Sequence, residues 1–206
     1  YDAPTNGVNR AGMLEDLEAL PAGSIVVLHA CCHNPTGVDL DLEDWKNVLQ
    51  VVKTKGHVPF LDMAYQGFGD GIDEDAFAVR LFAESGLEFF VSSSFSKSFS
   101  LYGERVGALS IVTASKDEST RVLSQVKRVI RTTYSNPPTH GATIVATVLN
   151  SAELRQMWET ELAEMRERIH GMRKQMVELL AHYGAKRDFS FVGRQVGMFS
   201  YSGLTV

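Results

Sequence analysis

The sequence predicts an α/β protein built on a largely parallel β-sheet. Short apolar runs rich in β-branched and aromatic residues alternate with segments of helical periodicity, and a Gly or Pro lies near each apolar run. When strand and helix alternate, successive strands run in the same direction and pair in parallel. An apolar content of 44% and a charged content of 22% are typical of a soluble globular protein.

Four strands and three helices are predicted in the first half of the chain. The strands are expected at residues 24–30, 58–62, 88–93 and 108–113, and the helices between them at residues 12–20, 42–55 and 75–85. The second helix has the clearest signals, because Asp41 is a favoured N-cap and Gly56 a favoured residue after the last turn. Gly86 ends the third helix in the same way.

A single long amphipathic helix is predicted at residues 152–183. Its apolar residues recur at spacings of three and four: Leu154, Trp158, Leu162, Met165, Ile169, Met172, Met176, Leu179 and Tyr183. A helix of this length is expected to leave one domain and enter another. We therefore predict a large domain at residues 1–164 and the beginning of a small domain at residues 165–206, with short strands at 189–191 and 197–201.

The bulk properties exclude several classes of function. The net charge of −5 and the sequence pI of 5.7 leave no basic footprint for nucleic acid. Apolar runs are too short to span a membrane, and a signal peptide is missing, so the expected location is the cytosol or an organelle matrix. Because the chain starts at Tyr1 and stops where another element is expected, we interpret it as a central fragment of a longer protein.

The two cysteines are adjacent, which argues against a disulfide framework. Cys31, Cys32 and His33 could suggest a metal site. Consecutive residues of a strand point to opposite faces, however, so these side chains are not expected to converge on one ion. We predict a buried, reduced pair and no metal site.

Lys97 lies in an unusual setting for a lysine, among serines and aromatic residues, with Arg105 eight positions later. Its amine could form a Schiff base with an aldehyde cofactor, while hydroxyl groups and a guanidinium hold a phosphate of the same cofactor. Pyridoxal 5'-phosphate has both groups. The alternative is that Lys97 ends a strand and points into water, as most lysines do.

Polar residues follow three of the predicted strands, at residues 29–34, 62–65 and 92–97. In parallel α/β sheets the carboxyl ends of the strands line the ligand crevice. These three strand ends would bring an amide, a carboxylate, a phenol, hydroxyls and an amine to one pocket. Taken singly, Asn34 before a proline is usually a turn, and Asp62 after a strand is often a helix cap.

Taken together and in this order, five segments resemble the fold-type I pyridoxal phosphate enzymes, specifically the class I aspartate and aromatic amino acid aminotransferases. The resemblance extends over essentially the whole chain and implies the large domain of that fold plus the start of a small α+β domain. Residues 101–105 and 197–201 resemble the bacterial aromatic aminotransferases more than the strictly aspartate-specific ones. The segments are residues 29–37 (HACCHNPTG), 62–68 (DMAYQGF), 94–97 (SFSK), 101–107 (LYGERVG) and 134–138 (YSNPP).

The resemblance implies roles for residues around the cofactor ring. Lys97 would form the internal aldimine and then move the substrate proton, with Tyr65 as a second catalytic residue. Asp62 would pair with the protonated pyridine nitrogen and keep the ring electron-withdrawing. Asn34 and Tyr65 would hydrogen-bond the phenolic oxygen, and His29 would support Asp62. The alternative for His29 is a satisfied buried histidine.

Further roles concern the phosphate and the substrate. The resemblance implies that Ser94, Ser96 and Arg105 bind the phosphate, and that Asn34 also contacts the substrate. Arg131 would reach across a dimer interface to the side-chain carboxylate of a dicarboxylic substrate. The alternative for Arg131 is a solvated helix end that complements the helix dipole.

The activity implied is transfer of an amino group from aspartate or an aromatic amino acid to 2-oxoglutarate, by a homodimer with shared active sites that serves amino acid metabolism and biosynthesis. The family's upstream phosphate-binding helix N-terminus and downstream arginine for the α-carboxylate lie outside this chain, so the fragment alone is expected to be inactive. One alternative is another pyridoxal phosphate reaction on the same scaffold. The other is an inactive fragment that acts only as a dimerisation module.

Overall fold

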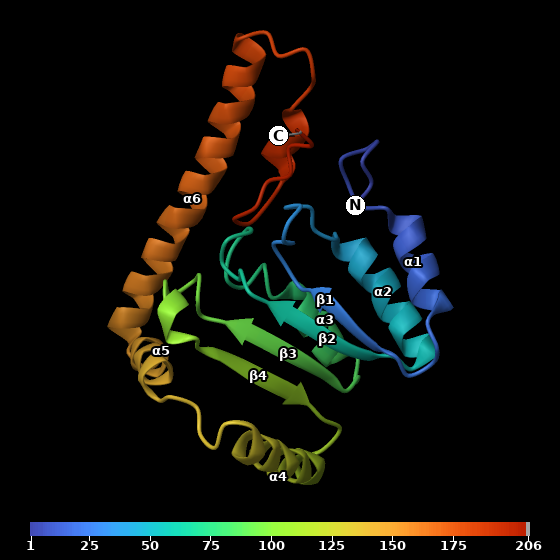
Figure 1. Cartoon of the computed structure of the whole chain (residues 1–206), viewed down its shortest axis with the longest axis vertical. Coiled ribbons are helices and arrows are strands. Elements are labelled where there is room, and N and C mark those ends of the chain that lie inside the picture. The colour runs from blue at the N-terminus through green and yellow to red at the C-terminus, as the bar shows by residue number, and fades with distance from the viewer. Residues whose placement is uncertain (205–206) are drawn as a thin grey trace.

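The computed structural model describes residues 1–204, so residues 205–206 of the predicted small domain lie outside the described part. Four strands, β1 (Ile25–His29), β2 (Val58–Met63), β3 (Phe89–Ser94) and β4 (Gly107–Val112), form one sheet in the order β1-β2-β3-β4 (Figure 1). The first three strands pair in parallel, and β4 pairs antiparallel with β3. All four predicted strands and the mixed, mostly parallel sheet are confirmed.

The helix α2 (Leu42–Lys55) forms where its end signals predict it. Asp41 accepts a hydrogen bond from the backbone N–H of Asp44, and the Asp44 side chain accepts one from the backbone of Asp41, which completes a capping box. Gly56 ends the helix at a φ of 62°, a left-handed conformation that glycine adopts without steric cost. Arg10, at the start of α1 (Arg10–Ala19), binds Asp44 at 2.6 Å and so connects the two helices.

The hydrophobic core lies on one face of the sheet, between the strands and the helices α1, α2 and α3 (Phe77–Glu84). Alternate residues of a strand point to opposite faces, so Val26 is buried while Ile25 and Val27 are more than 60% exposed. Phe82 of α3 is fully buried and contacts Trp45 and Phe89 edge to face. The predicted helices 12–20 and 75–85 are confirmed: α1 begins two residues earlier and ends one residue earlier than predicted, and α3 is shorter at both ends.

Three further helices follow the sheet: α4 (Lys116–Thr133), α5 (His140–Asn150) and α6 (Ala152–His182). The predicted long helix is confirmed to within one residue, and α5 is an element that the sequence analysis did not identify. Figure 1 shows α6 running from α5, near the end of β3, to the far end of the molecule, where the chain turns back toward the sheet. Among residues 1–204, no helix has both the length and the apolar character that a membrane span requires.

The two strands predicted at residues 189–191 and 197–201 are wrong. The first region is the 3₁₀ helix η2 (Ser190–Arg194), and the second has no regular secondary structure. Side chains satisfy the backbone groups that a neighbouring strand would have paired. Arg173 of α6 donates to the carbonyls of Gly197 and Phe199, and the Gln195 side chain bonds both the N–H and the C=O of Tyr201.

Candidate active site

The three predicted strand ends meet around Asp62. In the sheet register Asp62 lies between its partners His29 on β1 and Ser92 on β3. The Ser92 hydroxyl donates to Asp62 Oδ1 at 2.6 Å. The sequence analysis did not assign Ser92 a role, because only the strand pairing places it next to Asp62.

His29 lies on the other side of Asp62, at a distance of 4.0 Å from Nε2 to Oδ2. Its Nδ1 accepts a hydrogen bond from the backbone N–H of Asn34 at 3.2 Å. An accepting Nδ1 carries no proton, so a neutral His29 has its proton on Nε2, the atom that faces the Asp62 carboxylate. The supporting role of His29 stays a prediction.

Asn34 and Lys97 both lie close to Tyr65, which follows Asp62 by three residues. Asn34 Nδ2 donates to the Tyr65 hydroxyl at 3.3 Å, and Lys97 Nζ lies 4.5 Å from the centroid of the Tyr65 ring. Tyr65 is only 6% exposed, so surrounding side chains fix its ring. An amide and an amine from two separate strand ends therefore lie against one phenol from a third.

The loop that carries Lys97 is attached to α6. Phe99 stacks on Trp158 with ring centroids 4.5 Å apart, and Trp158 Nε1 donates to the carbonyl of Ser98 at 2.7 Å. The helical periodicity identified Trp158 only as an apolar position. Its support of the Lys97 loop depends on a contact 60 residues apart in the chain, for which the sequence has no local signal.

Asp39 holds the loop that leads from β1 to Asn34. Its carboxylate accepts hydrogen bonds from the backbone N–H groups of Cys32 and His33, the latter at 2.7 Å. Burial raises the pKa of Asp39, and these two hydrogen bonds act in the opposite direction. Burial also lowers the pKa of His33, with the nearby His29 as a second cause. Asp39 was not identified from the sequence.

The side chains of Cys31 and Cys32 lie close together, contrary to the expectation that strand geometry separates them. Cys31 and Cys32 follow β1 rather than lying within it, and Cys32 has a φ of 53°, so the strand alternation does not apply. Their sulfur atoms and a carboxylate oxygen of Asp75 lie within 4.8 Å of one another. The pKa of Cys32 is raised, mainly by a hydrogen bond with Cys31 and secondly by burial. A raised pKa favours the thiol, whereas metals bind the thiolate. The pair is buried and free, as predicted.

Ser94, Ser96 and Arg105 line one cavity together with Asp62 and Ser92. Ser94 Oγ accepts a hydrogen bond from the backbone N–H of Ser96 at 3.2 Å. Arg105 adopts a φ of 51°, and its Nη1 donates to the carbonyl of Tyr102 at 2.9 Å. The residues predicted to bind phosphate thus share the polar end of the cavity with the predicted partner of the ring nitrogen.

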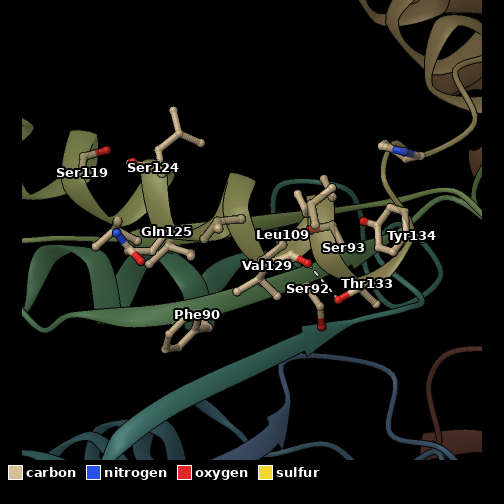
Figure 2. A pocket seen from close by; sticks show the side chains of 18 of the residues that line it. Phe90, Ser92, Ser93, Leu109, Ser119, Ser124, Gln125, Val129, Thr133 and Tyr134 are labelled. Carbon is tan, nitrogen blue, oxygen red and sulfur yellow. Dashed lines mark hydrogen bonds between the residues drawn. The ribbon is translucent and has the colours of Figure 1, made fainter.

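The remainder of this cavity lies between the sheet and α4, and its lining is mostly apolar with polar residues such as Gln125 among it. Figure 2 shows Phe90 and Leu109 of the sheet on one side and Val129 and Thr133 of α4 on the other. The cavity volume is about 1740 Å³. Pockets for small ligands usually measure about 300–1,000 Å³, so a cofactor at the polar end would fill only part of it.

Arg131 lies in the last turn of α4, apart from the residues described so far. Its guanidinium donates to the Ser135 hydroxyl, and its side chain is exposed. Among residues 1–204 no hydrogen bond or ion pair connects it to Lys97 or Asp62. The role across a dimer interface stays a prediction.

Comparison with known proteins gives concordant matches over the whole chain. The family model described as aminotransferase class I and II matches residues 1–206. An aspartate aminotransferase from Pseudomonas aeruginosa is 81% identical over 205 residues, which are 100% of this chain and 52% of that protein. An aromatic-amino-acid aminotransferase from Escherichia coli is 50% identical over 205 residues, again 100% of this chain and 52% of that protein.

A solved structure agrees with these relatives. The aromatic-amino-acid aminotransferase from Burkholderia pseudomallei, covalently bound to pyridoxal phosphate, superposes with a TM-score of 0.98 at 68% identity. The match covers 100% of this chain and 51% of that one. The chain therefore spans about half the length of the relatives and structures that it matches.

Proposed function

Because the chain belongs to the class I and II aminotransferase family, we propose that the protein containing it is a pyridoxal phosphate-dependent transaminase. The observation that carries the proposal is that Asn34 and Lys97, from two separate strand ends, both lie against Tyr65, which follows β2 three residues after Asp62. A structural lysine at the end of a strand needs none of these neighbours.

The donor set fits the chemistry of the proposed cofactor. Asp62 offers a carboxylate to a protonated pyridine nitrogen, and its Oδ1 already accepts one hydrogen bond from Ser92. Asn34 and Tyr65 offer an amide N–H and a hydroxyl to a phenolic oxygen. Ser94, Ser96 and Arg105 offer hydroxyls and a planar guanidinium to a phosphate: Ser96 is 6% exposed and Arg105 is exposed.

Pyridoxal phosphate supplies, when bound, an aldehyde carbon that combines with amines and a ring that withdraws electrons. Lys97 would provide the amine that holds the cofactor and, once released by the incoming amino acid, the base that moves the substrate proton. Asp62 would keep the ring nitrogen protonated, and His29 and Ser92 would hold the Asp62 carboxylate in place. Asn34 and Tyr65 would tune the charge on the phenolic oxygen.

We propose aspartate or an aromatic amino acid as donor and 2-oxoglutarate as acceptor, because the relatives carry both names. Arg131 would bind the side-chain carboxylate of a dicarboxylic substrate from across the interface of a homodimer. Within the whole protein, residues 1–164 would belong to the cofactor domain and residues 165–206 to a small domain, with α6 shared between them. The expected location is the cytoplasm or an organelle matrix, where such an enzyme would serve amino acid biosynthesis.

Reconstitution of the full-length protein with pyridoxal phosphate tests this proposal. The visible absorption band of an imine should appear on addition of the cofactor, and the protein should consume aspartate or tyrosine with 2-oxoglutarate. Lys97→Ala should abolish the imine band, whereas Lys127→Ala, the same change at an exposed position on α4, should retain it. An imine band that persists in Lys97→Ala would overturn the Schiff-base role, and turnover of neither amino acid would overturn the proposed activity.

A further inference from the structure

Asp75 is a buried carboxylate that precedes α3 and has no assigned role. It is 8% exposed, and its two oxygens accept hydrogen bonds from three backbone N–H groups. Gly67 and Gly69 donate to Oδ2 at 2.7 and 2.9 Å, and Asp70 donates to Oδ1 at 2.9 Å. A carboxylate that accepts three backbone hydrogen bonds over four residues fixes the course of that segment.

This segment is the turn at residues 66–70, which follows Tyr65 directly. Gly67 has a φ of 93°, and a Cβ atom there would lie 2.4 Å from Leu162 of α6. At Gly69 an added Cβ would lie 2.4 Å from Asp75 itself. The backbone of the turn is therefore packed directly between the carboxylate and the long helix.

The same turn is held from the side of α6. Arg166 Nη1 donates to the carbonyl of Gly67 at 3.1 Å, so the two peptide groups of Gly67 are bound by Asp75 on one side and Arg166 on the other. The backbone N–H of Phe68 bonds the carbonyl of Tyr65 at 3.1 Å. A movement of the turn is thereby transmitted to the backbone of Tyr65.

Tyr65 is the residue for which such a movement matters. Its hydroxyl lies 3.3 Å from the amide nitrogen of Asn34, and its ring faces the Lys97 amine. A hydrogen bond weakens steeply as its distance and angle depart from the optimum. A displacement of a few tenths of an ångström at the Tyr65 hydroxyl would therefore change how well it binds an oxyanion.

We propose that Asp75 is a positioning residue: by binding the turn at residues 66–70, its carboxylate sets the place of the Tyr65 hydroxyl beside the cofactor. The inference rests on the proposed function, since it assumes that Tyr65 binds the phenolic oxygen of pyridoxal phosphate. Arg166 serves the same purpose from the opposite side of the turn.

The experiment compares Asp75→Asn with Asp73→Asn in the full-length protein. Both changes remove one negative charge, but Asp73 is exposed, whereas an asparagine at position 75 loses at least one acceptor because its amide nitrogen cannot accept. The measurement is the pH titration of the visible absorption of the bound cofactor. A less well placed Tyr65 hydroxyl stabilises the phenolic anion less, so the adjacent imine nitrogen holds its proton to higher pH.

For Asp75→Asn we expect the midpoint of this titration to rise by about half to one pH unit. A displaced hydroxyl loses only part of the free energy of a hydrogen bond to a charged group, so the shift is smaller than that for complete loss of the bond. Amide hydrogen exchange at Gly67, Gly69 and Asp70 should become faster, and the cofactor should stay bound. Asp73→Asn should leave both the midpoint and the exchange rates unchanged. A merely structural role of Asp75 would change the exchange rates or the stability without moving the midpoint.

Arg166→Met provides a second route, because it removes the donor to Gly67 but keeps an unbranched apolar stem in place of the inner part of the arginine side chain. It should shift the midpoint in the same direction by a smaller amount, and it decides the matter if Asp75→Asn does not fold. An unchanged midpoint in a folded Asp75→Asn, or in Arg166→Met where the former is unfolded, would overturn the positioning role. If the wild-type protein forms no imine band at all, the proposed function fails instead, so the two failures are distinguishable.

Discussion

The region around β1–β3 and the region around β4 and α4 differ in how they hold their functional residues. In the first, the helices α1–α3 bury a core, and Asn34 and Lys97 each lie against Tyr65 from a different strand end. In the second, none of the residues of β4 and α4 is buried, and Arg105 and Arg131 donate only to groups three or four residues away. Contacts between distant segments therefore hold the side chains of the first region, whereas those of the second bond only to near neighbours in the chain.

The largest expected effect concerns the core of the first region. Phe82→Ala removes a fully buried aromatic ring and should lower the free energy of unfolding by about 3–5 kcal/mol. Leu123→Ala on α4 should change it by less than about 0.5 kcal/mol in the 206-residue chain, because its side chain is 52% exposed. The free energies of unfolding of both variants are measured by urea unfolding, with tryptophan fluorescence as the signal. Equal losses would show that α4 packs as tightly as the core.

The next effect tests the exposed arginine of the second region in the full-length enzyme. Arg131→Ala should lower kcat/KM for aspartate by about 30- to 150-fold, because truncating one partner of a charge pair costs about 2–3 kcal/mol. The kcat/KM for tyrosine should fall less than about threefold. Steady-state assays with both substrates measure this difference, with Arg128→Ala on the same helix as the control. Equal losses for aspartate and tyrosine would contradict a carboxylate-binding role.

The smallest effect compares the helix caps of the two regions. Asp41→Ala should destabilise the chain by about 1 kcal/mol, because it removes the N-cap of α2. The hydrogen bond from the backbone of Asp44 lowers the pKa of Asp41 in the folded state. The wild-type advantage should therefore be complete above the ordinary aspartate pKa of about 3.9, and it should be lost as the pH falls through the lowered folded value.

Ser115→Ala removes the N-cap of α4 and is the matched control. Its effect should be independent of pH, because a hydroxyl does not titrate in this range, and smaller than that of Asp41→Ala, because α4 buries none of its residues. Urea unfolding at several pH values checks both variants. A pH-independent loss in Asp41→Ala would show that the charge of the cap contributes nothing.

Local signals in the sequence were sufficient for much of the fold. Apolar runs predict all four strands, and Asp41 and Gly56 mark the ends of α2 because capping depends on neighbouring residues alone. The order of polar strand ends predicts that Asn34, Tyr65 and Lys97 meet, since parallel strands end at one edge of a sheet. The family model over residues 1–206 confirms the resemblance drawn from the motifs.

Contacts between distant segments account for what the sequence analysis missed. The segments 189–191 and 197–201 have the composition of strands, but the first lies at the start of a 3₁₀ helix, and in the second Arg173 and Gln195 bind the backbone groups. Ser92 and Trp158 support the site through a strand register and a helix contact that no local pattern encodes.

By itself the sequence determined the fold class and predicted the reactive lysine and the polar groups at the three strand ends, because these follow from local periodicity and from residue chemistry. Only the tertiary structure decided which groups hold them: Asp39 and Asp75 bind the backbone of the two loops that carry Asn34 and Tyr65. The physical reason is that a buried N–H group must find an acceptor, and the acceptor that is close in space need not be close along the chain.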